Sequence, residues 1–116
     1  MEIKRYEGTG RMSRAVVHNE TVYLCGQTCA DKNKDMKEQT KCVLEKVEEL
    51  LNKYNSDKKH ILSTTIYIKD MSMFKDMNEV WDSFIEDGFE PARACVEAKM
   101  AREEILVEMS VVAAVK

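Results

Sequence analysis

Hydrophobic positions recur along this chain with two different spacings, and each change of spacing marks the boundary of a predicted element. Alternation with a period of two indicates a strand, since successive side chains of a strand point to opposite faces of its sheet. A period of 3.6 indicates an amphipathic helix, and it holds over 35–54 and again from Ser72, the predicted N-cap of a second helix that ends before Gly88. The predicted strands are 3–6, 15–18, 21–25, 61–69, 91–100 and 105–115.

Two of these strands are predicted to form a hairpin. Segments 15–18 and 21–25 flank Asn19 and Glu20, and asparagine tolerates the left-handed backbone that a two-residue turn requires. Gly26 follows the hairpin directly. A glycine at the end of a strand often marks a place where the backbone closely approaches a ligand or another strand.

The order of the elements predicts the fold class. The series β, ββ, α, β, α, ββ indicates one α+β domain over residues 1–116, with a mixed sheet and both helices on one face of it. The last strand, 105–115, is apolar on both faces except for Glu108 and Ser110. Two helices on one face leave the other face without cover, so we expect a homo-oligomer whose sheets pack against each other.

Composition narrows the classes of function. The chain has 116 residues, of which 44% are hydrophobic, and a net charge of −3 with both signs interspersed. A broad nucleic-acid-binding surface needs clustered basic residues, which are not evident here. No apolar run approaches the roughly 18 residues of a membrane span, and the N-terminus lacks a secretory signal. We therefore expect a cytoplasmic protein that binds neither membrane nor nucleic acid.

The cysteines and histidines do not indicate a metal site. The cysteines fit no disulfide or zinc spacing, which favours reduced thiols. His18 and His60 have no metal-ligating neighbours in sequence and are expected at the surface. The four cysteines are Cys25, Cys29, Cys42 and Cys95.

Segment 91–100 carries the first candidate for chemistry. Its alternation places Arg93 and Cys95 on one face, while Ala94 and Val96 share the other, which we expect to be packed. An arginine can bind a carboxylate through two parallel hydrogen bonds, which lysine does less well. An arginine on a strand is nevertheless more often a surface or ion-paired residue, so both interpretations stay open.

Glu108 is the second candidate, in a strand that we expect to neighbour segment 91–100. Its apolar neighbours in sequence, among them Val107 and Met109, predict desolvation, which favours a protonated carboxyl and suits proton transfer. A buried salt bridge with Arg93 or Lys99 is an equally good interpretation from the residues alone.

Two further polar residues need an explanation. Asn78 falls on the apolar stripe of the second helix, between Phe74 and Trp81, where its amide must find partners. It could orient a ligand, or it could bind a loop backbone. Cys95 has no histidine near it in sequence to activate it, so the residues alone favour a packing role over a nucleophilic one.

Taken together, these motifs resemble the RidA (YjgF/YER057c/UK114) family. The resemblance rests on Pro-Ala-Arg-Ala-Cys-Val-Glu at 91–97, Val-Glu-Met at 107–109, Cys-Gly-Gln at 25–27 and Asn78 on the second helix. It spans nearly the whole chain and keeps the element order. It implies a chorismate-mutase-like α+β fold, assembled as a homotrimer with three clefts between subunits.

The resemblance also implies an activity and a role for each residue. The implied reaction is hydrolysis of reactive 2-imino and 2-enamino acids to 2-oxo acids and ammonia, without a cofactor. By position, Arg93 matches the arginine that holds the substrate carboxylate, and Glu108 matches the glutamate that positions and activates water. Cys95 matches the cysteine whose neighbourhood helps hold that water and the imine, while Asn78 and Gly26 match residues that line the cleft.

The chain departs from the family pattern at two positions near the implied cleft. Met12 stands where many members have the tyrosine of a Gly-Pro-Tyr turn, and Cys25 replaces the usual serine before Gly-Gln. These changes bear on the preferred substrate side chain. A non-catalytic trimer that binds small molecules or acts as a chaperone is therefore the alternative prediction. RNA cleavage, a label that members also carry, is the third and suits the charge pattern least.

Overall fold

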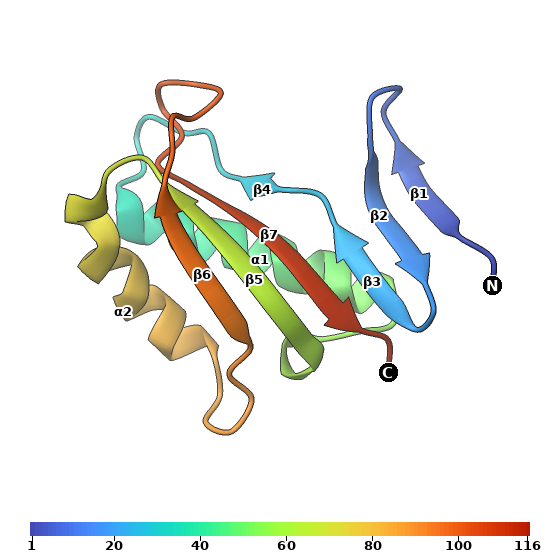
Figure 1. The fold of residues 1–116 in the computed structure, drawn as a ribbon. Coiled ribbons are helices and arrows are strands. Elements are labelled where there is room, and N and C mark those ends of the chain that lie inside the picture. The colour runs from blue at the N-terminus through green and yellow to red at the C-terminus, as the bar shows by residue number, and fades with distance from the viewer.

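One seven-stranded sheet organises the computed structural model, which describes residues 1–116 (Figure 1). The strand order is β1-β2-β3-β7-β5-β6, and β4 pairs with β7 beside this path. All pairs are antiparallel except β5 and β6, which are parallel, so the sheet is mixed as predicted. The strands are β1 (Lys4–Gly8), β2 (Ser13–His18), β3 (Thr21–Leu24), β4 (Gln27–Thr28), β5 (Ile61–Ile68), β6 (Ala92–Glu97) and β7 (Val107–Ala114).

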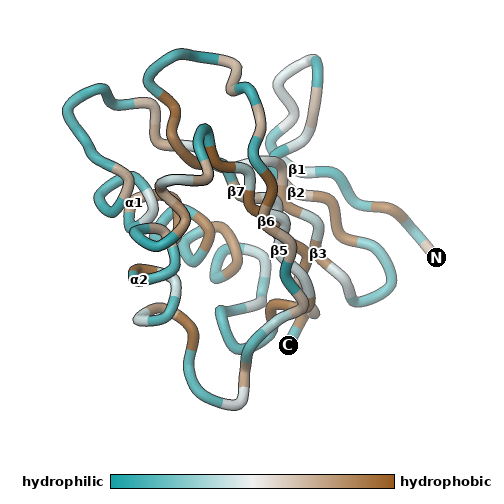
Figure 2. Tube along the Cα trace, turned by 60° about the vertical axis from the view of Figure 1, so that its left-hand side comes forward, coloured by the Kyte–Doolittle hydropathy of each residue, from teal (hydrophilic) through white to brown (hydrophobic).

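Two helices cover one face of this sheet, and the predicted α+β fold is confirmed. Helix α1 spans Met36–Lys53 and α2 spans Phe74–Phe84. Figure 2 shows both helices on the same side of β5, β6 and β7. Apolar side chains of α1 meet those of the central strands in a single core cluster. Fully buried members of the core include Val43, Val47, Leu51, Ile66, Met77, Met109 and Val111.

Local sequence accounts for how these elements begin and turn. Asp35 and Glu38 form a capping box at the start of α1, because each side chain accepts a hydrogen bond from the other residue's backbone N–H. Asn19 and Glu20 both have positive φ, 56° and 63°, as a two-residue hairpin turn requires. The predicted N-cap at Ser72 is wrong. A 3-10 turn, Met71–Met73, precedes α2, and Asp70 caps it by accepting the Ser72 N–H at 2.8 Å.

The sheet face opposite the helices is uncovered in a single chain. In β7, Val107, Met109, Val111 and Ala113 are buried beneath the helices, whereas the alternate residues are only half-buried. On the uncovered face Tyr23 is 45% exposed and Val96 43% exposed. The face of β6 that carries Ala94 and Val96 was predicted to be packed, but it is exposed in the single chain.

The cysteines differ from their prediction. Cys29, just after β4, forms a disulfide with Cys42 of α1, with Cα atoms 6.2 Å apart. Cys25 and Cys95 are free thiols. The prediction of four reduced thiols is wrong because the spacing of cysteines in the sequence does not reveal that the segment after β4 passes alongside α1.

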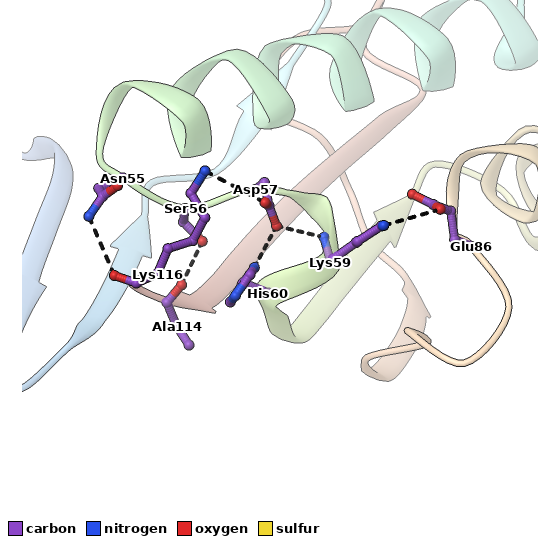
Figure 3. A network of polar contacts seen from close by, with 8 residues as sticks. All are labelled: Asn55, Ser56, Asp57, Lys59, His60, Glu86, Ala114 and Lys116. Atoms are coloured by element: carbon purple, nitrogen blue, oxygen red, sulfur yellow. Dashed lines mark hydrogen bonds and ion pairs between the residues drawn. The ribbon is translucent and has the colours of Figure 1, made fainter.

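A polar network joins the end of the chain to the loop between α1 and β5 (Figure 3). Asp57 lies at its centre, with its Oδ1 2.6 Å from Nδ1 of His60 and its Oδ2 3.7 Å from Nζ of Lys116. The buried Ser56 hydroxyl donates to the carbonyl of Ala114 at 2.6 Å. These contacts fix the C-terminal end of β7 against the loop. No helix of the structure has the length and apolar composition needed to cross a membrane.

Candidate functional site

Arg93 projects from β6 toward α2. Its strand partner is Thr64 of β5, which is buried on the helix side of the sheet. The guanidinium carbon lies 5.3 Å from the ring centroid of Trp81 and 5.8 Å from that of Phe74. Nη1 donates a hydrogen bond to Oδ1 of Asn78 at 2.7 Å. The guanidinium is thus held by aromatic faces and by one amide.

The three side chains that hold Arg93 come from one stripe of α2. Phe74, Asn78 and Trp81 are spaced by four and then three residues, so they lie one above the other on the helix surface. The amide oxygen of Asn78, which the sequence left without a partner, accepts its hydrogen bond from Arg93 and not from a loop backbone.

The Arg93 guanidinium has no acidic partner in the chain. It is exposed, and its single side-chain hydrogen bond, to Asn78, leaves most of its five N–H donors free. An exposed arginine whose orientation is fixed and whose charge is uncompensated can bind a carboxylate or a phosphate.

Cys95 lies two residues further along β6, on the same face as Arg93, as predicted. The side chain is half-buried and packs against the core. Burial raises the pKa of its thiol, and the nearby Arg93 charge opposes this only in part. The neutral thiol is therefore favoured, which supports a packing or cleft-lining role over a nucleophilic one.

Glu108 lies on the other face of the sheet, beside Gly26. Thr28 of β4 pairs with Glu108 of β7, and this pairing brings Gly26, two residues before Thr28, close to the carboxylate. A Cβ built on Gly26 would lie 3.0 Å from Cδ of Glu108 and closer still to Oε2. The close approach predicted at Gly26 is therefore made by a side chain of β7, and only glycine leaves room for it.

Val107 and Met109, the apolar neighbours that were predicted to desolvate Glu108, do not surround its carboxylate. Val107 and Met109, its neighbours in sequence, point to the helix side of β7, and Glu108 itself is half-buried on the uncovered face. Its cross-strand partner is Tyr67 of β5, which in turn pairs with Val96 of β6. The carboxylate thus lies among residues of the face that no helix covers.

Arg93 and Glu108 do not meet within one chain. The strands of Arg93 and Glu108, β6 and β7, were predicted to be neighbours, but strand β5 lies between them. The register also assigns the two residues to opposite faces, since Arg93 aligns with Thr64 and Val111, and Glu108 with Tyr67 and Val96. The intrachain salt bridge considered from the sequence is therefore not formed. We call Phe74, Asn78, Trp81, Arg93 and Cys95 the arginine half-site, and Gly26 with Glu108 the glutamate half-site.

The main cavities of the single chain lie away from both half-sites. One of about 480 Å³ lies between α1 and α2 and is lined by Leu44, Val80 and Phe84 with a charged rim. Another of about 610 Å³ lies beside Tyr6 and Tyr54. The chain also contains no cluster of His, Cys, Asp and Glu side chains able to hold a metal ion.

Sequence reasoning missed the role of two aromatic residues. Phe74 and Trp81 fall on the apolar stripe of the second helix, and Trp81 is a member of the core, but the sequence did not reveal that both rings face the Arg93 guanidinium. The signal that could have revealed them is the spacing of both rings around Asn78, because a polar residue on an apolar stripe indicates a polar partner from the opposing strand.

Comparison with known proteins assigns the chain to a family. The model of the family described as Endoribonuclease L-PSP matches residues 2–115. A crystal structure of a YjgF family member from Neisseria meningitidis superposes with a TM-score of 0.96 at 39% identity, covering 100% of this chain and 97% of that one. The chain belongs to the YjgF/RidA family.

Other relatives of this YjgF/RidA protein have similar lengths. The RutC family protein YoaB of Escherichia coli is 36% identical over 115 residues, covering 99% of this chain and 100% of the relative. A RutC family protein of Haemophilus ducreyi is 35% identical over 113 residues, covering 97% of each. The family resemblance inferred from the motifs is confirmed.

Proposed function

We propose that this YjgF/RidA protein hydrolyses reactive 2-imino and 2-enamino acids to 2-oxo acids and ammonia. We further propose that it acts as a homotrimer, with each site in a cleft between two subunits. The single observation that carries this proposal is the orientation of Arg93, an uncompensated cation of β6 that is held against α2 with free donors for a carboxylate.

The placement of the two half-sites supports a site between subunits. The arginine half-site and the glutamate half-site lie on opposite faces of the sheet, so one chain cannot place both against a small substrate. The uncovered face also carries exposed apolar side chains, among them Tyr23 and Val96. Packing of this face against the β6–α2 edge of a neighbouring copy, where the arginine half-site lies, would bring Glu108 of one subunit toward Arg93 of another.

The chemistry needs only orientation and one activated water. Arg93 binds the carboxylate of the imino acid and thereby fixes the C=N carbon next to it. Glu108 accepts a proton from water as the water oxygen bonds to that carbon, and the C=N nitrogen takes up a proton. The resulting carbinolamine loses ammonia, and the C=O bond of the 2-oxo acid forms. One imino acid and one water thus give one 2-oxo acid and one ammonia, and no cofactor is required.

Substitution of Arg93 tests the proposal. An imine generated in situ from an amino acid should decay faster with the native protein, and Arg93→Ala should lower that acceleration by about 100-fold or more. Arg102→Ala, which removes an exposed arginine from the loop after β6, is the matched control and should keep full activity. The oligomeric state of each variant is measured by light scattering. Equal decay rates for Arg93→Ala and native protein, with the same assembly, would refute the proposal.

A binding protein without catalysis is the second candidate. Met12, which occupies the position of the family tyrosine, is 53% exposed at the turn between β1 and β2, so it supplies neither the aromatic ring nor the hydroxyl of tyrosine. This candidate is favoured if a 2-oxo acid binds at Arg93 while no imine is turned over. RNA cleavage is a third candidate, and it requires RNA degradation that is lost in a single-residue variant of highly purified protein.

A further inference from the structure

One stripe of α2 surrounds the Arg93 side chain with two kinds of contact. Phe74 and Trp81 present ring faces at 5.8 and 5.3 Å from the guanidinium carbon, and Asn78 between them accepts a hydrogen bond at 2.7 Å. Both ring distances fall within the roughly 6 Å range of cation–π attraction. The arginine itself has no carboxylate partner, so these contacts alone fix its orientation.

We infer that Phe74 and Trp81 are positioning residues for Arg93, which hold its guanidinium so that one edge stays on Asn78 and the other edge faces the carboxylate of a 2-imino or 2-oxo acid. This inference rests on the proposed function, since it assumes that Arg93 is the carboxylate anchor. It assigns to α2 the task of fixing the anchor before the ligand arrives.

The physical reason is the flexibility of arginine. A free arginine side chain samples many rotamers, and binding a carboxylate in a fixed geometry removes that freedom. Aromatic faces on which the guanidinium rests restrict it in advance, so less entropy is lost on binding. The two rings differ in their surroundings, because Trp81 is 6% exposed while Phe74 is 37% exposed. Phe74 can therefore be changed with less damage to the core.

Trp81 also provides a direct optical readout. It is the only tryptophan of the chain, and its indole lies against the group that we expect to bind the ligand. Neutralisation of Arg93 by a carboxylate alters the electric field at the indole. Titration with a non-reactive 2-oxo acid such as 2-oxobutanoate should therefore change Trp81 fluorescence in the native protein and leave it unchanged in Arg93→Ala.

The test compares Phe74→Leu with a matched aromatic control. Phe89 is 44% exposed and lies under a different cation, Lys59, at 5.2 Å, so Phe89→Leu removes an equivalent ring away from Arg93. We expect Phe74→Leu to raise the Kd of 2-oxobutanoate and the KM of the imine about 5-fold, with kcat unchanged, because ground state and transition state lose the same contact. Phe74→Tyr, which keeps the ring, should restore both values. Phe89→Leu should change neither.

The possible failures can be told apart. If Arg93→Ala loses ligand binding while Phe74→Leu binds as well as Phe89→Leu, the positioning role is wrong and the proposed function stands. If Arg93→Ala binds 2-oxobutanoate as tightly as the native protein, the carboxylate anchor itself is wrong, and with it both proposals. If Phe74→Leu weakens binding but no imine is hydrolysed, the positioning role holds and the deaminase activity is refuted. Circular dichroism and thermal unfolding check that each variant is folded.

Discussion

The Glu108 carboxylate occupies the space that any side chain on Gly26 would need. The three heavy atoms nearest to a Cβ at position 26 would be Oε2, Cδ and Cγ of Glu108. The neighbour that must move is therefore the end of a flexible side chain and not backbone. Gly26 thus leaves the space in which the proposed catalytic carboxylate lies.

We predict that Gly26→Ala folds normally but loses about 100-fold in imine hydrolysis, because the displaced carboxylate no longer meets the water. Activity and urea unfolding are measured on the same preparation. Gly8→Ala is the control, since the nearest atom to a Cβ there is Met12 O at 4.0 Å. Glu108→Asp shortens the side chain, so adding it to Gly26→Ala should recover part of the activity. Native activity in Gly26→Ala would contradict the prediction.

The Cys29–Cys42 disulfide should stabilise the fold measurably. It closes a loop of 13 residues, and loops of this length contribute about 3 kcal/mol by restricting the unfolded chain. A reductant should therefore lower the urea midpoint of the native protein. The double variant Cys29→Ala/Cys42→Ala should unfold at the same urea concentration with and without reductant. A native midpoint that is insensitive to full reduction would show that the disulfide contributes nothing.

Asp57 should make stability depend on pH in the acid range. The contact with His60 is the main cause that lowers the pKa of Asp57 below its ordinary value, with further contributions from the Lys59 N–H and Lys116 (Figure 3). A carboxylate whose pKa is lowered by folding stabilises the protein above the pKa of the unfolded chain. That stabilisation is lost as the pH falls through the lower folded value.

Asp57→Asn should therefore destabilise the protein at pH 7 by roughly 1 kcal/mol, and by progressively less below about pH 4. Urea unfolding at a series of pH values from 7 to 2.5 measures the difference. Asp82→Asn, on an exposed position of α2, is the control and should change stability little at any pH. A difference between Asp57→Asn and native protein that stays constant over this range would rule out the linkage.

Thr64 offers a route to a more stable protein. Its hydroxyl is buried beside Arg93 in the sheet and has no hydrogen-bond partner. Thr64→Val keeps the shape and removes the unpaired group, so the free energy of unfolding should rise by about 1 kcal/mol. Thr40 is the matched contrast, because its buried hydroxyl donates to the Met36 carbonyl at 2.7 Å, and Thr40→Val should destabilise. If Thr64→Val destabilises as much as Thr40→Val, the hydroxyl has a partner such as a bound water.

The elements that the sequence predicted are those with a long, regular pattern. Helix α1 follows its period closely, and the turn at Asn19 is fixed by local chemistry. Strand β5 is rich in β-branched residues, although a bulge at Ile61–Ser63 interrupts its alternation. Strand β4 has two residues, too few to form a pattern, and exists because β7 offers it a pairing edge. The segment 91–100 continues to alternate after Glu97, yet β6 ends there, because strand length depends on the partner β5 and not on the segment alone.

In the candidate site, too, the features that depend on local sequence were predicted, and those that depend on strand pairing were not. Alternation within β6 correctly assigned Arg93 and Cys95 to one face, since that relation is local. The faces of Arg93 and Glu108 relative to each other depend on the register of β5 with both β6 and β7, which no local pattern contains. The disulfide likewise depends on how α1 passes the segment after β4.

Because the half-sites lie on opposite faces, two inactive variants should be able to complement each other in a mixed trimer. A chain with Arg93→Ala still carries an intact Glu108, and a chain with Glu108→Gln still carries an intact Arg93. When two such inactive chains are unfolded together and reassembled at equal amounts, roughly a quarter of the interfaces in the proposed trimer should join one intact residue of each kind. Activity recovered from a mixture of two dead proteins would thus reveal that every working centre is shared between neighbours.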